Sequence, residues 1–474
     1  MQLNHIVLQN FRQYKHARFN FHPHFTVLIG NNGAGKTTVL DAIALLLNTY
    51  FQGSGIVAAG GSIKKEDARL VITEKAGQVF RERASDVRLS AAAGINGVAL
   101  EWFREIGDRA GNAKNLVQLG MNDRARLAEN PDLPLLLYYG AGRLWDVHHA
   151  VETEKPESQL DAYRYCLDPK SDQKAFEKWF KRLAYSELQK GRKIPALSAV
   201  KNAVLICIPG AQDFYYDTGE DQIMIKLDAG GLQPFNYLSD GYRNMVAMVA
   251  DIAHRASRLN PQHGIETATL TKGVVLIDEI DLHLHPKWQR RVVDDLQKAF
   301  PNLQFIATTH SPFILQSLAP GEVIDLDNVM VDTDILTATA GCAAPGPEHA
   351  FSHRSIEDIA ETVMGVDLPQ RSERYQQMFD IAKQYYSLLE QGQAANEMEK
   401  QRIKIELDRL SAPFSENIAY YAFLEMKRLA AGMSDFQDDP DMLQRLIEAF
   451  PGTCTDCFDA KQGYVAIARP RGQC

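Results

Sequence analysis

The chain has 474 residues, of which 51 are basic and 60 are acidic, so its net charge is −9. Apolar residues make up 45% and charged residues 23%, a composition typical of folded globular domains. The length predicts roughly two to four modules. The composition excludes collagen-like, mucin-like and low-complexity proteins. The negative charge argues against a polybasic nucleic-acid binder but leaves local basic patches open.

Signals for membranes and export are absent from the sequence. No apolar run approaches the roughly 18 residues that span a bilayer. The first residues lack the basic and apolar segments of a signal peptide. Six cysteines are too few for a disulfide framework. We therefore expect a cytoplasmic protein with reduced cysteines and no membrane contact.

The first third of the chain alternates between strand patterns and one helix pattern. Apolar alternation or short apolar runs predict strands at residues 3–9, 17–21, 25–29, 68–73, 78–81, 97–102 and 135–139. Those between 68 and 102 indicate an antiparallel lobe. A glycine-rich loop follows the strand at 25–29, and an apolar stripe predicts a helix over 37–47.

The middle of the chain mixes helices with short buried strands. Helices are predicted over residues 170–205, 239–257 and 286–300, a hairpin over 214–227, and buried strands at 274–277 and 304–308. The first helical region carries an apolar stripe, which we assign to core packing: Phe176, Trp179, Phe180 and Leu183.

The character changes after about residue 330. Residues 338–347 are rich in Ala, Gly and Pro and indicate a linker, and residues 355–450 are charged and largely helical, with a helical hairpin or short coiled coil at 375–409. We expect an α/β ATPase domain at 1–335 that carries a lobe insertion at about 50–235. A helical region at 350–474 would bind a partner or build an oligomer.

One segment matches the phosphate-binding pattern G-x-x-x-x-G-K-[ST] without a mismatch: Gly30, Asn31, Asn32, Gly33, Ala34, Gly35, Lys36 and Thr37. Glycines let backbone N–H groups turn toward phosphates, and the following helix directs its N-terminus at the same anion. Lys36 would reach the β- and γ-phosphates, and Thr37 would ligate Mg²⁺.

Three further segments fit around a bound nucleotide. The strand at 274–277 ends in Asp278 and Glu279, which suit a Mg²⁺ shell and an attacking water. Ser239 opens a helix and offers either an N-cap or a phosphate ligand. His310 follows the strand at 304–308, where a side chain can point at the γ-phosphate.

Together these segments resemble the ATP-binding-cassette (ABC) ATPases of the RecF/SMC/OLD group. That resemblance implies ATP and Mg²⁺ as cofactors and a mixed sheet with flanking helices. It makes residues 30–38, up to Thr38, the Walker A motif, residues 238–242 with Ser239 and Gly241 the signature, and residues 281–286 the D-loop. Mg²⁺ would be held by Thr37 and Asp278. Glu279 would be the general base, His310 the switch histidine, and Lys36 a catalytic residue.

The resemblance also implies a head-to-tail dimer, in which each copy places its signature on the other copy's ATP. One residue departs from the family pattern, because Asp240 stands where the signature has glycine. A carboxylate there repels phosphate unless it faces away. This leaves slow hydrolysis, or binding without turnover, open.

A narrower resemblance is to defence-island ATPases, above all the ATPase subunit of Septu-type anti-phage systems, with retron-linked ATPases nearby. The segments that carry it are residues 138–143, 160–164, 355–366 and 420–428. It implies a regulatory ATPase that controls a separate HNH-type nuclease, with DNA reached through the complex. Arg143 would contact nucleotide or form a structural salt bridge.

Three other functions stay open. The first is a RecF-like DNA repair ATPase that clamps DNA on binding ATP; the others are a scaffold without turnover and a transporter ATPase.

The sequence argues against several further domains. Lys36 and Ser239 are 203 positions apart, which leaves too few residues for the long coiled-coil arms of SMC proteins. Residues 439–441 suit an acidic turn better than a Toprim nuclease. A zinc site at Cys454 and Cys457 has too few ligands nearby.

Overall fold

The protein is described by a computed structural model. It covers residues 1–52, 56, 58, 61–75, 78–95, 97–107, 109–111, 113–143, 158–170, 173–327, 351, 354–364 and parts of 377–411. The chain divides into two compact units, residues 1–364 and 365–474, and each is described by itself. Among the described helices, none has the length and apolar character required to cross a bilayer.

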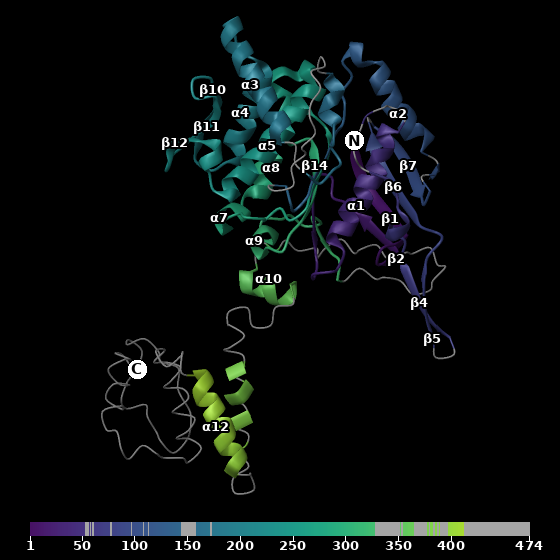
Figure 1. Cartoon of the computed structure of the whole chain (residues 1–474), viewed down its shortest axis with the longest axis vertical. Helices are drawn as coiled ribbons and strands as arrows, with labels where there is room; N and C mark the ends of the chain where they lie inside the picture. The colour runs from purple at the N-terminus through teal and green to yellow at the C-terminus, as the bar shows by residue number, and fades with distance from the viewer. Residues whose placement is uncertain are drawn as a thin grey trace, which may run out of the picture. The chain divides into compact units, whose positions relative to one another are not determined.

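The centre of the first unit is a five-stranded parallel sheet. Its order is β15 (Val323–Asp325), β3 (Phe25–Ile29), β14 (Leu303–Thr308), β13 (Gly273–Ile277) and β9 (Leu135–Tyr139). Four of these strands are buried along their whole length, as apolar runs in covered parallel sheets are. Figure 1 shows α1 (Lys36–Leu47) and α5 (Asp240–Leu259) on either side. The carboxyl ends of the strands share one edge, where parallel sheets place ligand sites.

A second, antiparallel sheet contains the strand predicted at 97–102, whereas the strands predicted at 68–73 and 78–81 pair with each other in a separate hairpin. The order of this second sheet is β2 (Tyr14–Asn20), β1 (Gln2–Phe11), β6 (Arg88–Ile95), β7 (Val98–Glu105) and β8 (Arg109–Gly111). The sequence analysis missed β6, since a run of small residues at its centre carries little strand propensity. The other described strands form two smaller sheets: the hairpin β4 (Leu70–Lys75) with β5 (Gln78–Arg83), and β10 (Ala211–Asp217), β11 (Gln222–Leu227) and β12 (Gly231–Pro234).

Two predicted helices are each broken into two. The region 170–205 forms α3 (Gln173–Lys190) and α4 (Pro195–Cys207), separated by Gly191 in the left-handed conformation. The region 286–300 forms α7 (Pro286–Gln289) and α8 (Val292–Ala299), because Arg291 leaves helical geometry. The predicted core stripe is confirmed, as Phe176, Trp179 and Phe180 are all buried.

The remaining elements of the first unit are short. They are α2 (Lys114–Ala125), α6 (Thr267–Leu270), α9 (Pro312–Leu315), α10 (Ile356–Thr362) and the 3-10 turns η1 (Asn48–Phe51), η2 (Lys65–Asp67), η3 (Leu127–Glu129), η4 (Gln159–Tyr163), η5 (Phe235–Tyr237) and η6 (Pro261–Glu266). In the second unit α12 (Glu397–Ser411) packs Leu407 and Leu410 against Met378 and Tyr385. The predicted linker, the 335–350 boundary and residues 412–474 lie outside the described residues.

Candidate functional site

The Walker A loop joins β3 to α1 and is built on left-handed glycines. Gly30, Gly33 and Gly35 have φ angles of 142°, 90° and 96°, a region that side chains rarely enter. Lys36 Nζ donates hydrogen bonds to the carbonyl oxygens of Gly30 (2.8 Å) and Asn31 (3.2 Å). Burial lowers the pKa of Lys36, against the opposing effect of nearby carboxylates. The ammonium group is thus held inside a loop whose shape suits a phosphate chain.

Asp278 connects the Walker A helix to the end of β14. Thr37 Oγ1 donates to Asp278 Oδ2 over 2.9 Å, and Thr308 Oγ1 donates to Asp278 Oδ1 over 2.7 Å. The Asp278 backbone N–H also donates to the carbonyl of Tyr139. Three segments that the sequence analysis assigned to one site therefore meet at a single carboxylate.

Glu279 follows in a left-handed conformation with a φ of 51°. A non-glycine residue pays about 1–2 kcal/mol to adopt it. The turn is held because the Glu279 N–H donates to Thr308 Oγ1 (2.7 Å) and the Ile280 N–H donates to the Thr308 carbonyl (2.9 Å). The Glu279 side chain is half-buried at this edge of the sheet.

Arg143 holds the Glu279 turn in place through hydrogen bonds to its backbone. Its guanidinium donates to the carbonyls of Gly140 (3.1 Å), Asp278 (2.7 Å) and Glu279 (3.0 Å), and Nε donates to Asn244 Oδ1 (2.6 Å). The side chain is buried, and burial lowers the pKa of Arg143 to about 10. The structure thus gives Arg143 a positioning role through the carbonyl oxygens of this turn.

The segment around His310 is tied to the D-loop before the histidine and to α7 after it. Thr309 Oγ1 donates to Asp281 Oδ1 (2.6 Å), and Ser311 Oγ donates to Gln289 Oε1 (2.7 Å). The Thr309 N–H donates to the Leu28 carbonyl, two residues before the Walker A loop. His310 itself is exposed between these two anchored neighbours.

The signature residues open α5 and contact the D-loop. Ser239 is the N-cap, is exposed, and makes no side-chain capping bond. A Cβ on Gly241 would lie 2.4 Å from the His283 carbonyl oxygen, so this close approach requires glycine. Asp240 forms an ion pair with Arg243 (3.3 Å), which offsets the charge expected to repel phosphate. Among the described residues, no hydrogen bond joins Ser239 to the Walker A loop of its own chain.

Sequence reasoning missed several residues that contact the Walker A loop or the helix α1 that follows it. Tyr14 Oη donates to the Ala34 carbonyl (2.8 Å), and Arg12 pairs with Asp41 of α1 (2.6 Å). Asp327 Oδ2 accepts the Asn31 N–H (2.8 Å). The three-residue strand β15 delivers Asp327, and its shortness explains why no pattern indicated it.

The donor set at the sheet edge fits a magnesium ion. Thr37 Oγ1 and Asp278 Oδ2 are a hydroxyl and a carboxylate oxygen at 2.9 Å. Mg²⁺ is commonly held by one or two such protein oxygens together with the phosphates of a nucleotide. These two residues are therefore the ones that would hold it.

Comparison with known proteins shows which proteins this chain is similar to. Residues 25–316 match the AAA_21 family, described as "AAA domain, putative AbiEii toxin, Type IV TA system". The chain is 25% identical to the "Retron Vc95 probable ATPase" of Vibrio cholerae over 83% of this chain and 84% of that protein. It is 26% identical to the "Septu protein PtuA" of Bacillus mycoides over 91% of this chain, but spans about half (55%) of that protein's length.

Among solved structures, the SMC head domain from Thermotoga maritima aligns with a TM-score of 0.38 at 15% identity, over 69% of this chain and 94% of that one. The family match covers the Walker A loop, the signature, Asp278, Glu279 and His310. The chain therefore belongs to the AAA_21 family of ATPases.

Proposed function

We propose that the chain is the ATP-hydrolysing regulatory subunit of a bacterial anti-phage defence complex. The observation that carries the ATPase part is the convergence of Thr37 and Thr308 on Asp278, next to Glu279. The defence role is supported by the similarity to a retron ATPase and to a Septu protein.

In the proposed site the triphosphate lies against the backbone N–H groups of residues 31–38, and Lys36 neutralises its β- and γ-phosphates. Mg²⁺, held by Thr37 and Asp278, supplies charge neutralisation when bound. Glu279 orients a water toward the γ-phosphorus and takes its proton. His310 donates to the γ-phosphate and so distinguishes ATP from ADP.

The proposed switch is a head-to-tail dimer. The exposed and uncapped hydroxyl of Ser239, together with the N–H groups at Gly241, would complete the site of the other copy. ATP binding closes the dimer and hydrolysis opens it, since only ATP contacts both copies through its γ-phosphate. The controlled partner is proposed to be an HNH-type nuclease.

Three variants test this proposal in order. Lys36→Ala should abolish ATP binding, and Glu279→Gln should bind ATP, stop phosphate release and accumulate dimers in light scattering. Asp294→Asn, an exposed carboxylate on α8, is the control for a lost charge. Unchanged ATP binding by Lys36→Ala would refute the site.

Co-purification with a nuclease supports the defence role, whereas ATP-dependent, salt-sensitive DNA binding by the chain alone favours the RecF-like alternative.

A further inference from the structure

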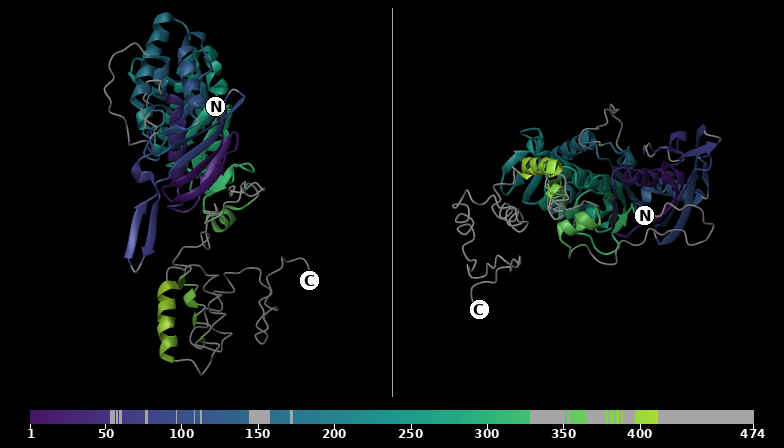
Figure 2. Two further views of the ribbon diagram at one scale, coloured as in Figure 1. Left: turned by 90° about the vertical axis from the view of Figure 1, so that its right-hand side faces the viewer. Right: turned by 90° about the horizontal axis from the view of Figure 1, so that it is seen from below.

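The hairpin β4–β5 stands out from the body of the first unit. Its two strands pair from Leu70 with Arg83 to Lys75 with Gln78, and no third strand of the described residues joins them. Figure 2 shows the hairpin projecting away from the sheets in side view. All six residues of β5 are exposed. A two-stranded hairpin alone is marginally stable in water, so one that projects this way is suited to contact something else.

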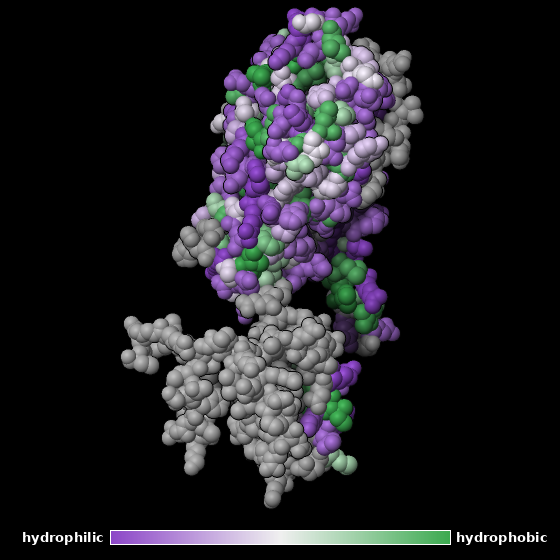
Figure 3. Space-filling model, turned by 90° about the vertical axis from the view of Figure 1, so that its left-hand side faces the viewer, coloured by the Kyte–Doolittle hydropathy of each residue, from purple (hydrophilic) through white to green (hydrophobic). Residues whose placement is uncertain are grey.

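One face of this hairpin is apolar and basic. Paired residues share a face, so Leu70, Ile72, Val79 and Arg81 lie on the same side, together with Arg83 and, near the tip, Glu74. We call the first four of these residues the arm face. Ile72 and Val79 are 61% and 58% exposed, and Figure 3 shows hydrophobic residues gathered on the projecting hairpin. Exposed apolar residues beside an arginine are typical of protein interfaces.

The root of the hairpin is joined to the Walker A helix. The Arg12 N–H donates to the Asp67 carbonyl, and the Arg69 N–H donates to the Asn10 carbonyl. The Arg12 guanidinium then bridges Asp67 (3.1 Å) and Asp41 of α1 (2.6 Å). The hairpin is therefore fixed to the nucleotide side of the unit and does not hang from a free linker.

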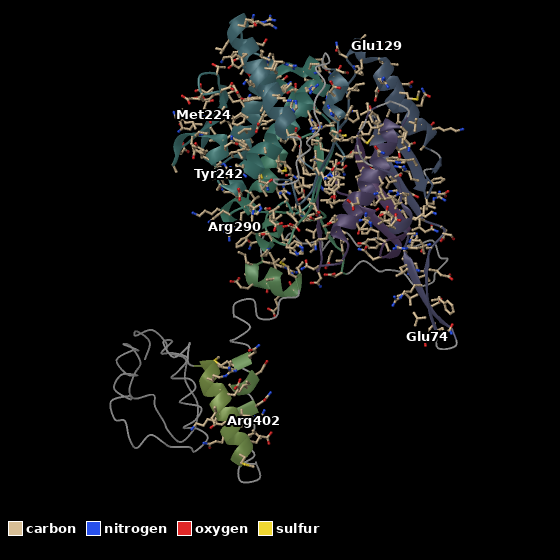
Figure 4. All side chains as sticks on the ribbon, in the orientation of Figure 1. Glu74, Glu129, Met224, Tyr242, Arg290 and Arg402 are labelled. Atoms are coloured by element: carbon tan, nitrogen blue, oxygen red, sulfur yellow. The ribbon has the colours of Figure 1, made fainter. Side chains whose placement is uncertain are left out.

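A second exposed apolar surface lies beside the signature. Leu232 in β12 is 51% exposed and Tyr237 in η5 is 80% exposed, just before Ser239. With the exposed Asp228 they form what we call the signature flank. Figure 4 places Glu74, at the hairpin tip, and Met224 and Tyr242, beside this flank, at opposite sides of the unit.

The two surfaces are complementary in charge as well as in apolar character. Residues 64–83, which contain the hairpin and its root, carry six basic and four acidic side chains. Residues 211–243, which contain the signature flank, carry two basic and six acidic side chains. The first segment is net positive. The second stays net negative even though Lys181 and Lys201 of the same copy pair with its Asp221 and Asp213, so two copies attract each other in this orientation.

We propose that the arm face of one copy packs on the signature flank of a second copy when ATP closes the dimer. This inference rests on the head-to-tail dimer of the proposed function. A two-fold dimer sets the Walker A side of each copy against the signature side of the other, and each contact occurs twice. Because the arm is rooted on the Walker A side, it extends toward the flank of the opposite copy.

Cysteine cross-linking between two differently labelled chains tests the contact. Full-length chains with Ile72→Cys and with Leu232→Cys, both also carrying Glu279→Gln, are mixed and oxidised with or without ATP. We expect a mixed disulfide dimer, identified by mass spectrometry, that forms only with ATP. Val98→Cys replaces Ile72→Cys as control. Val98 is 58% exposed, nearly as much as Ile72, but lies near the Gln2 end of its sheet, away from the arm root.

A second measurement uses the double variant Ile72→Ser with Val79→Ser. Both side chains are exposed, so the fold and ATP binding at Lys36 should be unchanged. The ATP-dependent dimer should dissociate at least tenfold more readily in analytical ultracentrifugation. If the double variant dimerises with wild-type affinity and the ATP-dependent disulfide does not form in the cross-linking experiment, the arm contact is refuted.

The two proposals fail in different ways. If the Glu279→Gln chain stays monomeric with ATP, the dimer itself is refuted and the arm contact with it. If it dimerises but the double variant dimerises equally, only the arm contact is refuted. If the double variant instead loses salt-dependent binding to duplex DNA at unchanged dimer affinity, the arm is a nucleic-acid contact and our proposal is wrong.

Discussion

The hydroxyl of Thr37 and the carboxylate of Asp278 are 241 residues apart in the chain and 2.9 Å apart in the fold. Thr308 donates to the other carboxylate oxygen. Both oxygens of Asp278 are therefore fixed by hydroxyl donors, and the carboxylate is oriented before any cation arrives. A cation can bind there once the Thr37 hydroxyl rotates and presents a lone pair. Thr308, at the end of β14, therefore orients the Asp278 carboxylate as much as Thr37 of the Walker A motif does.

Thr308→Val tests this supporting role. Valine keeps the shape but removes the donor to Asp278 and the acceptor of the Glu279 N–H. We expect unfolding free energy to fall by about 1–3 kcal/mol, because two buried groups lose their partner. Phosphate release should fall at least tenfold while ATP affinity changes little. Thr308→Ser retains the hydroxyl and is the matched control; turnover by the valine variant at the wild-type rate would contradict the role.

Arg143→Met tests the anchor beneath the Glu279 turn. The guanidinium satisfies three carbonyls and the Asn244 side chain, and unpaired buried acceptors are destabilising. We expect a loss of about 3 kcal/mol or more in urea unfolding, with Arg143→Lys intermediate because an ammonium group cannot reproduce the planar fork. Arg126→Met is the control, since Arg126 is exposed and pairs with Glu129; it should leave the midpoint unchanged. Equal midpoints for both methionine variants would contradict the anchor.

The sequence revealed the chemistry of the site better than its support. Lys36, Thr37, Asp278 and Glu279 lie in local patterns, and parallel strands necessarily bring their carboxyl ends to one edge. The contacts of Arg143 and Asp327 are long-range hydrogen bonds to backbone groups. Such bonds require no particular residue type in the partner segment, so no periodicity or spacing in the sequence records them.

The same distinction applies to the fold. Buried strands such as β3 and β14 are short and mostly apolar and were predicted closely. The helix breaks at Gly191 and Arg291 were not predicted. Gly191 and Pro195 are residue types that commonly end and begin helices, whereas no such residue marks the break at Arg291, where tertiary packing decides.

His254 makes the stability of α5 dependent on pH. Its ring is buried 4.3 Å from the Trp179 ring and contacts Asp251 at 3.5 Å. Burial lowers the pKa of His254 to about 4, against the opposing effect of Asp251, while Arg258 and Arg255 lower it further. The unfolded chain binds a proton near pH 6.5 and the folded chain does not, so stability falls as pH drops from 6.5 to 4.

The expected loss across that window is roughly 2–3 kcal/mol from this group. Urea unfolding of the wild-type chain is compared with His254→Gln, which cannot titrate and should show a flatter profile between pH 6.5 and pH 4. Asp251 does not affect this comparison. Arg255 holds the pKa of Asp251 at about 2 despite burial, so the contribution of Asp251 to stability is lost only below this pH window. Parallel profiles for the two chains would show that His254 is not the titrating group.

Asp327 places a carboxylate on the Walker A loop, where it accepts the Asn31 N–H over 2.8 Å. This charge stabilises the ammonium of Lys36 in the free loop, but it repels the phosphates of an arriving nucleotide. Asp327→Asn keeps an oxygen that accepts the same N–H and removes the charge. We therefore expect ATP to bind about three- to tenfold more tightly, a change that corresponds to roughly 0.7–1.4 kcal/mol.

Titration of a fluorescent ATP analogue at two salt concentrations measures this change, because added salt should narrow the difference in ATP affinity between the variant and the wild type. Asp294→Asn removes a distant exposed charge and should bind as the wild type does. Weaker binding by Asp327→Asn would instead mean that the carboxylate holds the loop in its binding shape.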